Sequence, residues 1–567
     1  MMVEQEACQP MRALLGLGQI DPPHGRNDDS ICRMDDDSIC RMDIVATALL
    51  CCTCLAGCVR AGFGVAGDGS STRDALSDGS SFPPEAVFIS PNGDDDNPGT
   101  RDRPWRTFPV ALSRLSPGDT LVALPGVYGA ASGTGYLRAD CSAGATGCAG
   151  GACPNGTAAQ PITVMAEQER TAFLKAEIDT GTPLKLASCR HYRLIGLRAE
   201  NIDDPDGTSA EGNSVDIESC EDVTLRRMLA ARPNRYFNSK PVHVARSNNV
   251  LVEECEAYNF HSVAFIAIES DNVVLRRNYA NSRRVGPIAG GFNESCGNAA
   301  DVGSKSGGIY IWWSDGCVVE NNVVEDVCNG FIVLGDSNKV AGNMVLGRFA
   351  VGYQADSKCG GQVPCTDAGS ISRDNSFTDN LSVGGYWGWY LSGAVGTTVA
   401  HATAVGYEDM GVFGALASGN QGLAATLEVV ASVTASTGAP RGFRIEDQQS
   451  FAITYSNAYG NEVDYAPATT EPSNSSYDPQ LGGCYVYVPE GSPGKGAGPG
   501  GSDVGANIVW RTEDGALTAG RLWDQASGRF PCGATVTGVN DDKTFSDSCC
   551  VNVHRRLHLG TGGCAAP

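Results

Sequence analysis

The chain has 567 residues, of which 71 are glycine and 23 are cysteine, and its formal net charge is −24 at pH 7. This acidic balance argues against nucleic acid as a partner, because phosphate backbones attract basic surfaces. It is compatible with Ca²⁺ binding, although a solvated acidic surface is the commoner reason for an excess of carboxylates.

Residues 1–41 are interpreted as a leader that does not belong to the fold. They contain a perfect duplication, since the segment Asp-Asp-Ser-Ile-Cys-Arg-Met-Asp beginning at Asp28 recurs from Asp36. We therefore expect translation to start at Met34 or Met42.

Residues 42–58 read as a lipoprotein signal. Their apolar run is too short to span a bilayer and is typical of a signal sequence; the alternative is a buried strand. The run ends in Leu-Ala-Gly-Cys58, which resembles a bacterial lipobox. The resemblance implies acylation of Cys58 and a lipid-anchored protein of the bacterial envelope, at the outer membrane or the cell surface. Residues 59–86 are rich in Gly, Ser and Asp and are expected to form a flexible tether.

The cysteines after Cys58 number sixteen, an even count that favours disulfides in an exported protein. Several lie in loops suited to cross-links, namely Cys141, Cys148, Cys153, Cys359, Cys365, Cys532, Cys549, Cys550 and Cys564. Cys189 and Cys220 occupy equivalent places in the repeat described next, so the alternative for them is stacking. The connectivity stays open.

A short pattern recurs between residues 242 and 347. Its copies begin at Val242, Phe265, Ile309 and Phe331, so the starts are 23, 44 and 22 residues apart. The period is therefore near 22, and the middle gap is one period plus an insertion of similar length. Each copy shows two short alternating strands separated by polar turns. Since such a unit cannot bury its own apolar face, the period predicts stacked coils, with parallel strands and right-handed crossovers.

Alternation along each strand assigns side chains to two columns. The inward column contains Val242, Val244, Phe265, Ala267, Ile309, Ile311, Phe331 and Val333, and the outward column Asp216, His243, Ile266, Tyr310 and Ile332. Asn278, Asn322 and Asn343 recur at one place in the coils. We interpret them as stacked turn amides bonded to one another and to the backbone.

The segment from Val87 to Tyr128 resembles the opening motif of β-helix proteins of the pectate-lyase-like superfamily. The resemblance implies a first strand, a capping helix at about residues 104–115, and the strand that opens the coils. The fold class is therefore all-β: a right-handed parallel β-helix over residues 87–480. Residues 481–567 are expected to form the closing segment and an irregular, cysteine-rich C-terminal cap that packs on the last coils.

Enzymes of this superfamily commonly cleave acidic polysaccharides on the outside of the coils by β-elimination. The reaction needs a base to remove the proton next to a carboxylate, and a cation to neutralise that carboxylate. The extra 22 or so residues between the copies at Phe265 and Ile309 supply such groups. Lys305 is the predicted base, with Arg284 as the second choice and His243 one or two coils away.

Other residues of this region suit a sugar and a metal ion. Tyr310 and Trp312 are predicted to face outward and to contact the apolar face of a sugar ring. Asp301, Glu294 and Asp216 would hold Ca²⁺. The alternative is that the insertion only covers exposed aromatic side chains.

No catalytic motif of polygalacturonases or common pectate lyases is present as a complete set. Two hypotheses therefore remain. The first is an exported, lipid-anchored, monomeric β-helix protein that acts on polysaccharide, as a lyase of acidic glycans. The second is a non-catalytic glycan-binding, adhesin-like or structural envelope protein of the same fold.

Overall fold

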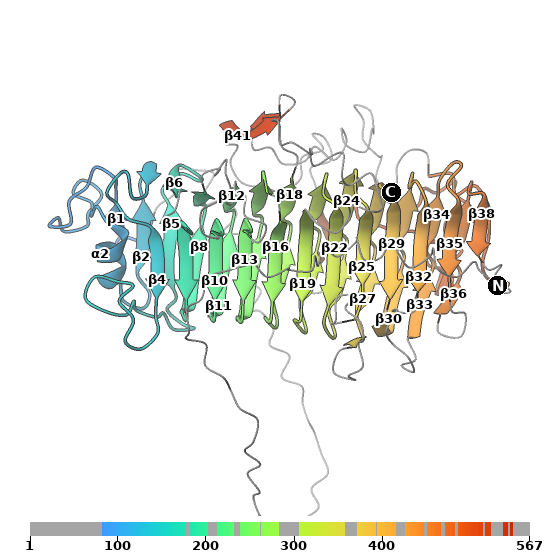
Figure 1. Ribbon diagram of the computed structural model, residues 1–567, viewed down its shortest axis with the longest axis horizontal. Coiled ribbons are helices and arrows are strands. Elements are labelled where there is room, and N and C mark those ends of the chain that lie inside the picture. The colour runs from blue at the N-terminus through green and yellow to red at the C-terminus, as the bar shows by residue number, and fades with distance from the viewer. Residues whose placement is uncertain are drawn as a thin grey trace, which may run out of the picture. The chain divides into compact units, whose positions relative to one another are not determined.

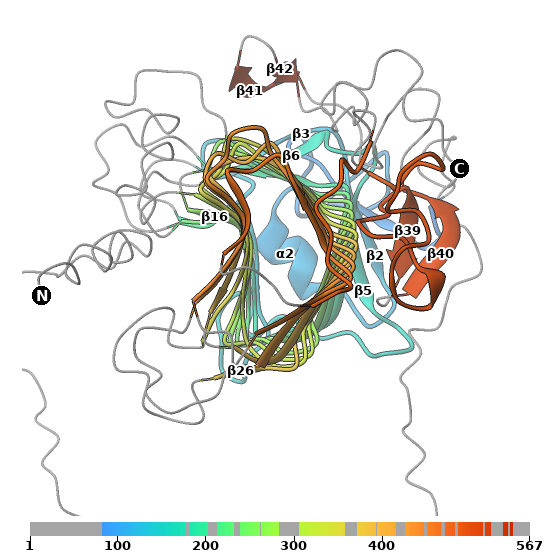
Figure 2. The ribbon, with the colours of Figure 1, turned by 90° about the vertical axis from the view of Figure 1, so that its right-hand side faces the viewer.

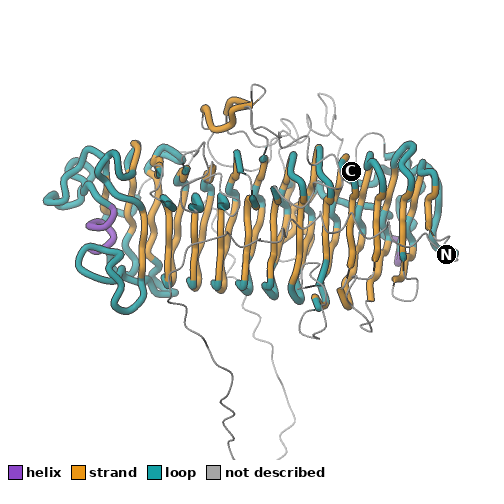
Figure 3. The backbone as a smooth tube through the Cα atoms, in the orientation of Figure 1, coloured by secondary structure: helices purple, strands orange, loops and turns teal. Residues whose placement is uncertain are grey.

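The computed structural model describes residues 82–176, 181–201, 212–231, 239–260, 262–282, 306–357, 371–392, 394–415, 426–446, 451–466, 471–481, 486–513, 516–522, 537–542 and 545–547. Over these residues the chain forms a parallel β-helix built from three long sheets (Figures 1 and 3). This confirms the predicted all-β fold and its parallel β-helix.

Each coil contributes one strand to each of three sheets, which we name I, II and III in the order in which a coil visits them. Sheet I contains β4 (Leu137–Asp140), β7 (Leu184–Ala187), β10 (Val215–Glu218), β13 (Val242–Ala245), β16 (Val263–Ile268), β19 (Gly307–Trp312), β22 (Asn329–Leu334), β25 (Val351–Ala355), β29 (Trp387–Ser392), β32 (Met410–Ala415), β35 (Arg441–Ile445) and β38 (Val463–Ala466). Sheet II contains β1 (Val87–Ile89), β2 (Thr120–Ala123), β5 (Ile162–Ala166), β8 (Arg190–Ile195), β11 (Glu221–Arg226), β14 (Asn248–Glu253), β17 (Val274–Arg276), β20 (Val318–Glu320), β23 (Lys339–Ala341), β26 (Ser372–Arg373), β27 (Ser376–Thr378), β30 (Ala394–Ala400), β33 (Thr426–Val430) and β36 (Phe451–Thr454). Sheet III contains β3 (Gly126–Tyr128), β6 (Ala172–Lys175), β9 (Arg198–Glu200), β12 (Leu229–Ala231), β15 (Glu256–Tyr258), β18 (Tyr279–Asn281), β21 (Val323–Glu325), β24 (Met344–Gly347), β28 (Leu381–Gly384), β31 (Thr403–Val405), β34 (Val433–Ala435) and β37 (Asn457–Tyr459).

The coil has three strands, whereas the repeat predicted two. Most strands of sheet III are only three or four residues long. So short a segment shows too little alternation to be recognised as a strand from its sequence.

The predicted inward column forms the core. Val242 pairs with Phe265, Phe265 with Ile309, and Ile309 with Phe331, and all four side chains are buried. Toward the later coils the same column becomes aromatic. The ring of Tyr353 lies 5.0 Å from that of Phe331 and 4.2 Å from that of Trp389, centroid to centroid.

The one α-helix among the described residues, α2 (Phe108–Ser113), closes the N-terminal end of this core. Its Phe108, Ala111 and Leu112 are fully buried and belong to the same apolar cluster as the coils. Figure 2, which views the stack end-on, shows α2 lying across the interior enclosed by the three sheets. The capping helix is thus shorter than the predicted range of about residues 104–115.

Side-chain ladders stabilise the two tight turns of each coil. At the turn from sheet II to sheet III, Asn278 Nδ2 donates to Asn322 Oδ1 over 3.1 Å. In the same way, Asn322 Nδ2 donates to Asn343 Oδ1, and Asn343 Nδ2 donates to Asn380 Oδ1, each over 3.0 Å. The interpretation of these asparagines as stacked turn amides is confirmed.

A second ladder, of serines, lies at the turn from sheet I to sheet II and was not predicted. The backbone N–H of Cys220 donates to Ser247 Oγ. In the same way, the N–H of Ser247 donates to Ser270 Oγ, and the N–H of Ser270 to Ser314 Oγ. Because each hydroxyl accepts from the turn of the preceding coil, the ladder fixes the register of neighbouring coils.

Two disulfides lie in the N-terminal coils, Cys141–Cys189 and Cys148–Cys153. Both use cysteines that were expected in cross-links, but Cys189 is bonded to Cys141 and does not simply stack. Cys220 keeps a buried free thiol in the next coil, where it accepts a hydrogen bond from the backbone N–H of Cys189. Cys359, Cys365, Cys532, Cys549, Cys550 and Cys564 lie outside the described residues.

The closing segment runs back along the coils instead of covering the last of them. Later residues of this segment bond to earlier coils. The backbone N–H of Gly505 donates to the carbonyl of Ala431, that of Asn507 to Asp379 Oδ1, and that of Thr512 to Asn321 Oδ1. Its apolar side chains pack on the outer side of sheet III, and these are Val486, Ile508, Val509 and Leu522. Two antiparallel hairpins follow, β39 (Trp510–Glu513) with β40 (Ala516–Arg521) and β41 (Thr537–Asp542) with β42 (Phe545–Asp547).

Candidate functional site

The outer face of sheet I carries a column of side chains whose chemistry changes along the stack. Register pairs place Asp216 beside His243, Ile266, Tyr310 and Ile332 in successive coils, as predicted. The column begins with Arg138 and Lys185, and it continues after Ile332 through Gln354, Tyr390, Phe413 and Arg444. It therefore passes from charged to apolar to aromatic.

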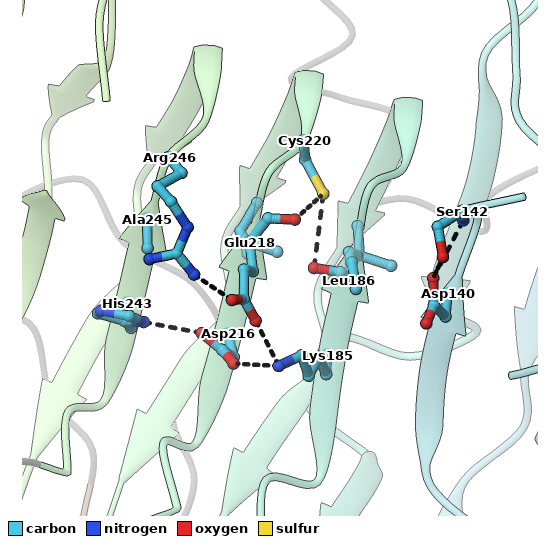
Figure 4. Close-up of polar contacts among 12 residues, drawn as sticks. Asp140, Ser142, Lys185, Leu186, Asp216, Glu218, Cys220, His243, Ala245 and Arg246 are labelled. Carbon is cyan, nitrogen blue, oxygen red and sulfur yellow. Dashed lines mark hydrogen bonds and ion pairs between the residues drawn. The ribbon is translucent and has the colours of Figure 1, made fainter. Parts of the chain in front are cut away.

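Five charged or polar residues form an ionic cluster at the N-terminal part of this face (Figure 4). His243 Nδ1 lies 2.8 Å from Asp216 Oδ1, and Lys185 Nζ lies 3.1 Å from Asp216 Oδ2. Lys185 also donates to Glu218 over 2.6 Å, and Arg246 binds the other oxygen of Glu218. Because the Asp216 carboxylate only accepts, His243 carries its proton on Nδ1, and its Nε2 is the atom available for proton transfer.

The cluster keeps its acidic members ionised. Burial raises the pKa of Asp216, but the hydrogen bond and charge of His243, together with Lys185, outweigh it and leave the pKa below its ordinary value. The hydrogen bond from Lys185 holds the pKa of Glu218 low. For Lys185 itself, burial lowers the pKa, yet its bonds to Glu218 and Asp216 leave it above the ordinary value.

The middle of the face is apolar. Ile266, Tyr310 and Ile332 pack into a small cluster of their own, and Tyr310 is only 8% exposed. Trp312 stacks beside Tyr310 at a ring distance of 6.2 Å and is partly buried. Tyr310 and Trp312 thus point outward as predicted, but Tyr310 offers little open ring surface. The Tyr310 hydroxyl accepts a hydrogen bond from Asn329 Nδ2.

An aromatic group follows toward the C-terminal coils, made of Trp387, Tyr390 and Phe413. Trp387 lies 5.9 Å from Tyr390 and 5.4 Å from Phe413, measured between ring centroids. The Trp387 indole N–H donates to Asp409 Oδ2 over 2.7 Å, and the Arg444 guanidinium lies 5.1 Å above the Phe413 ring. Trp387 is partly exposed and packs against the outer side of this cluster.

The structure brings together only some of the predicted site residues. His243 and Asp216 bond directly, and Tyr310 and Trp312 stack. Lys305, Arg284, Asp301, Glu294 and Cys58 lie outside the described residues. Asp216 already binds Lys185 and His243, so Ca²⁺ at this carboxylate would have to displace Lys185.

Two further searches concern only the described part of the chain. There, no group of three or more His, Cys, Asp or Glu side chains is arranged to hold a metal ion. No helix among these residues has the length and apolar character needed to cross a membrane.

The aromatic group was missed by sequence analysis, although a signal for it exists. Tyr353 follows Phe331 by one period of 22 residues, which marks β25 as the next coil. Extending the columns from there places Gln354 beside Ile332, and Tyr390 beside Gln354, on the outer face.

Comparison with known proteins gives a family match over part of the chain. Residues 292–478 match the family described as periplasmic copper-binding protein (NosD). No curated protein matches the sequence.

Several solved structures are similar in fold. A rhamnogalacturonan lyase shares 12% identity, covering 68% of this chain and 89% of its own, at a TM-score of 0.34. The pectate lyase Pel9A shares 13% identity over 76% of this chain and 98% of its own, at a TM-score of 0.37. A mannuronic acid-specific family 6 polysaccharide lyase from human gut microbiota shares 12% identity over 70% and 92%, at a TM-score of 0.41. At such identities the similarity concerns the fold alone.

Proposed function

We propose that the protein binds polysaccharide on the outer face of sheet I, with the aromatic group of Trp387, Tyr390 and Phe413 as the main contact. The observation that carries this proposal is the partly exposed Trp387 ring, which bonds Asp409 through its indole N–H and packs against Phe413, over which the Arg444 guanidinium lies. A sugar ring has an apolar face that stacks on an aromatic side chain, and hydroxyl groups that bond to charged neighbours.

The rigidity of the scaffold supports this function. Tyr390 and Phe413 are buried in the outer cluster, and their strands are fixed by register pairs on both sides. The aromatic group is thus held in place before any ligand arrives, which reduces the entropy lost on binding.

Replacing Trp387 by Ala should weaken glycan binding about tenfold or more, equivalent to about 1.4 kcal/mol, because the stacking surface is lost. Affinity electrophoresis in gels containing pectate, alginate or a neutral glucan measures this effect.

A matched control is Tyr459→Ala, which removes a ring that is 40% exposed at the end of β37 in sheet III. We expect this variant to bind as the unmodified protein does. Equal binding by Trp387→Ala and Tyr459→Ala, or absence of binding to every glycan, would refute the proposal.

A second candidate function is cleavage of an acidic glycan by β-elimination, favoured by the bond between His243 and Asp216. A carboxylate that holds Nδ1–H orients the imidazole and leaves Nε2 to accept or donate a proton. Lys305 and Arg284 remain alternative bases in this proposal, and Asp301 and Glu294 remain proposed Ca²⁺ ligands.

If His243 transfers the proton, His243→Ala should lower the rate of product formation about 100-fold or more, followed as absorbance near 235 nm with and without Ca²⁺. The control is His191→Ala, because His191 makes a similar bond of 2.6 Å to Asp222 on sheet II. Loss of the activity in Lys305→Ala but not in His243→Ala would assign the base to Lys305.

We also propose that the protein is exported and anchored through Cys58. Two disulfides among the described residues support an oxidising compartment.

A further inference from the structure

The closing segment contacts the coils along one line, the turn from sheet II to sheet III. One residue of this turn has a left-handed backbone conformation, with φ between 50° and 56° in Asn321, Asp379, His401 and Ala431. Each of these four residues bonds to the closing segment. Since Asp379 and His401 can gain or lose a proton, the attachment of the segment involves titratable groups.

Asp379 and His401 bond to residues of the closing segment that are close in sequence. Asp379 Oδ1 accepts from the backbone N–H of Asn507 over 2.9 Å. His401 follows Asp379 by one coil, and its Nδ1 lies 2.9 Å from the carbonyl oxygen of Asp503. Because a carbonyl oxygen only accepts, this Nδ1 carries a proton whether the imidazole is neutral or charged. The bond of His401 therefore persists across the pH range, whereas the carboxyl group of Asp379 can change its state.

The closing segment also brings charged groups to this turn. The Asp503 carboxylate accepts from Lys495 Nζ over 3.1 Å and from the backbone N–H of Gly496 over 3.0 Å. Lys495 Nζ also lies 3.4 Å from a carboxylate oxygen of Glu490. The positive charge of Lys495 is thus shared between two carboxylates of the segment itself. Docking therefore places the negative charge of Asp503 near Asp379.

The coils contribute little charge around Asp379. The corresponding residue of the preceding turn is Gly342, whose N–H donates to the carbonyl of Thr378. The residue of the following turn is His401. Among the described residues, the charges that act on Asp379 are those of His401 and Asp503.

These surroundings favour the protonated form of Asp379. Burial raises its pKa to about 6, and the Asp503 charge adds to this effect, while the N–H of Asn507 and the charge of His401 partly oppose it. Without the closing segment Asp379 would be more exposed and farther from Asp503, so its pKa would return toward the ordinary value of about 3.9. The docked state therefore binds a proton more readily than the undocked state.

The direction of the pH effect follows from this difference. Because the pKa of Asp379 is raised in the docked state, its contribution to docking is fully present below about pH 4 and is lost as the pH rises through about 6. Separation of the segment would uncover the apolar outer side of sheet III, on which Val486 and Ile508 pack.

We propose that the closing segment is a pH-sensitive conformational switch, which docks on the coils with uptake of a proton at Asp379. It is held tightly in acid and opens more often at neutral pH. His401 fixes the segment at Asp503 in both conditions, and Asp379 is the group that responds to pH. This inference does not depend on glycan binding.

Hydrogen exchange of the full-length protein, followed by mass spectrometry between pH 4.5 and 8, tests this inference. The informative amides are those of Gly505, Ala506 and Asn507, which donate to the coils. After correction for the intrinsic exchange rate, we expect their opening equilibrium to rise about tenfold or more across this range. The amides of β10 and β13, which lie far from the closing segment in the stack, serve as the internal reference and should not follow this rise.

Two variants separate Asp379 from other titrating groups. Asp379→Asn keeps an acceptor for the Asn507 N–H but cannot ionise, so its opening equilibrium should stay nearly constant with pH. The matched control is Asp374→Asn, since Asp374 has the same left-handed conformation, with φ of 55°, and is exposed. This control should keep the pH dependence of the unmodified protein.

A constant opening equilibrium in the unmodified protein would overturn the inference, and so would an undiminished rise in Asp379→Asn. If Asp379→Asn does not fold, Asp379→Gly takes its place, because glycine suits the left-handed conformation and already occupies this position as Gly342 in the preceding coil. Asp379→Gly should open more often at every pH and show no pH dependence, and a tenfold rise in this variant would contradict the inference.

Discussion

Replacing Trp389 by Ala should destabilise the protein by about 3–5 kcal/mol, because it removes the largest fully buried side chain of the described residues and leaves a cavity. Trp389 stacks on Tyr353 at 4.2 Å and meets Phe377 edge-on at 5.6 Å. The loss therefore affects two neighbouring coils at once. Urea unfolding followed by circular dichroism measures the effect.

Two variants serve as controls for this prediction. Trp389→Phe should cost less, since it keeps a ring in the stack and removes an indole N–H that has no hydrogen-bond partner among the described residues. Trp313→Ala removes a ring that is 46% exposed at a turn and should change stability by about 0.5 kcal/mol or less. A similar small change for Trp389→Ala would show that the aromatic column does not carry the core.

Replacing Glu256 by Met should cost about 3–5 kcal/mol, because it removes the carboxylate that binds the buried Arg170 guanidinium. The side chains of Arg170 and Glu256 are 0% and 1% exposed, and the Tyr258 hydroxyl also donates to Glu256. The double variant Arg170→Met with Glu256→Met should recover much of the loss, since neither charge then remains in the interior. Denaturant unfolding of the two single variants and the double variant measures this coupling.

The comparison for this ion pair is Arg101 with Glu167, where the Arg101 side chain is 67% exposed. Arg101→Met should change stability by about 1 kcal/mol or less. If Glu256→Met costs no more than Arg101→Met, the buried pair is not needed for stability.

The sequence predicted the coil because the repeat is a local signal repeated many times. Val242, Phe265, Ile309 and Phe331 keep one period, and their register pairs follow from it directly. The third strand of each coil could not be predicted, because three residues such as Leu229–Ala231 contain no usable periodicity.

The candidate site was less predictable. Alternation placed His243 and Asp216 on one face, but their hydrogen bond depends on side-chain positions in two neighbouring coils. The environment of Trp387 depends on its bond to Asp409, which no local pattern reports. The neighbouring Tyr390, however, follows from the columns extended through β25, so the position of the aromatic group was recoverable although its chemistry was not.

The closing segment affects how the coils unfold. In an ordinary stack of repeats the terminal unit has one neighbour and frays first. Here Thr512 is bonded to Asn321 across 191 positions of sequence, and Gly505 to Ala431. The closing segment therefore bonds to coils from the middle of the stack to near its end, so these coils should unfold as a single cooperative unit. These bonds can form only after the closing segment has left the ribosome, whereas the N-terminal coils can fold during synthesis.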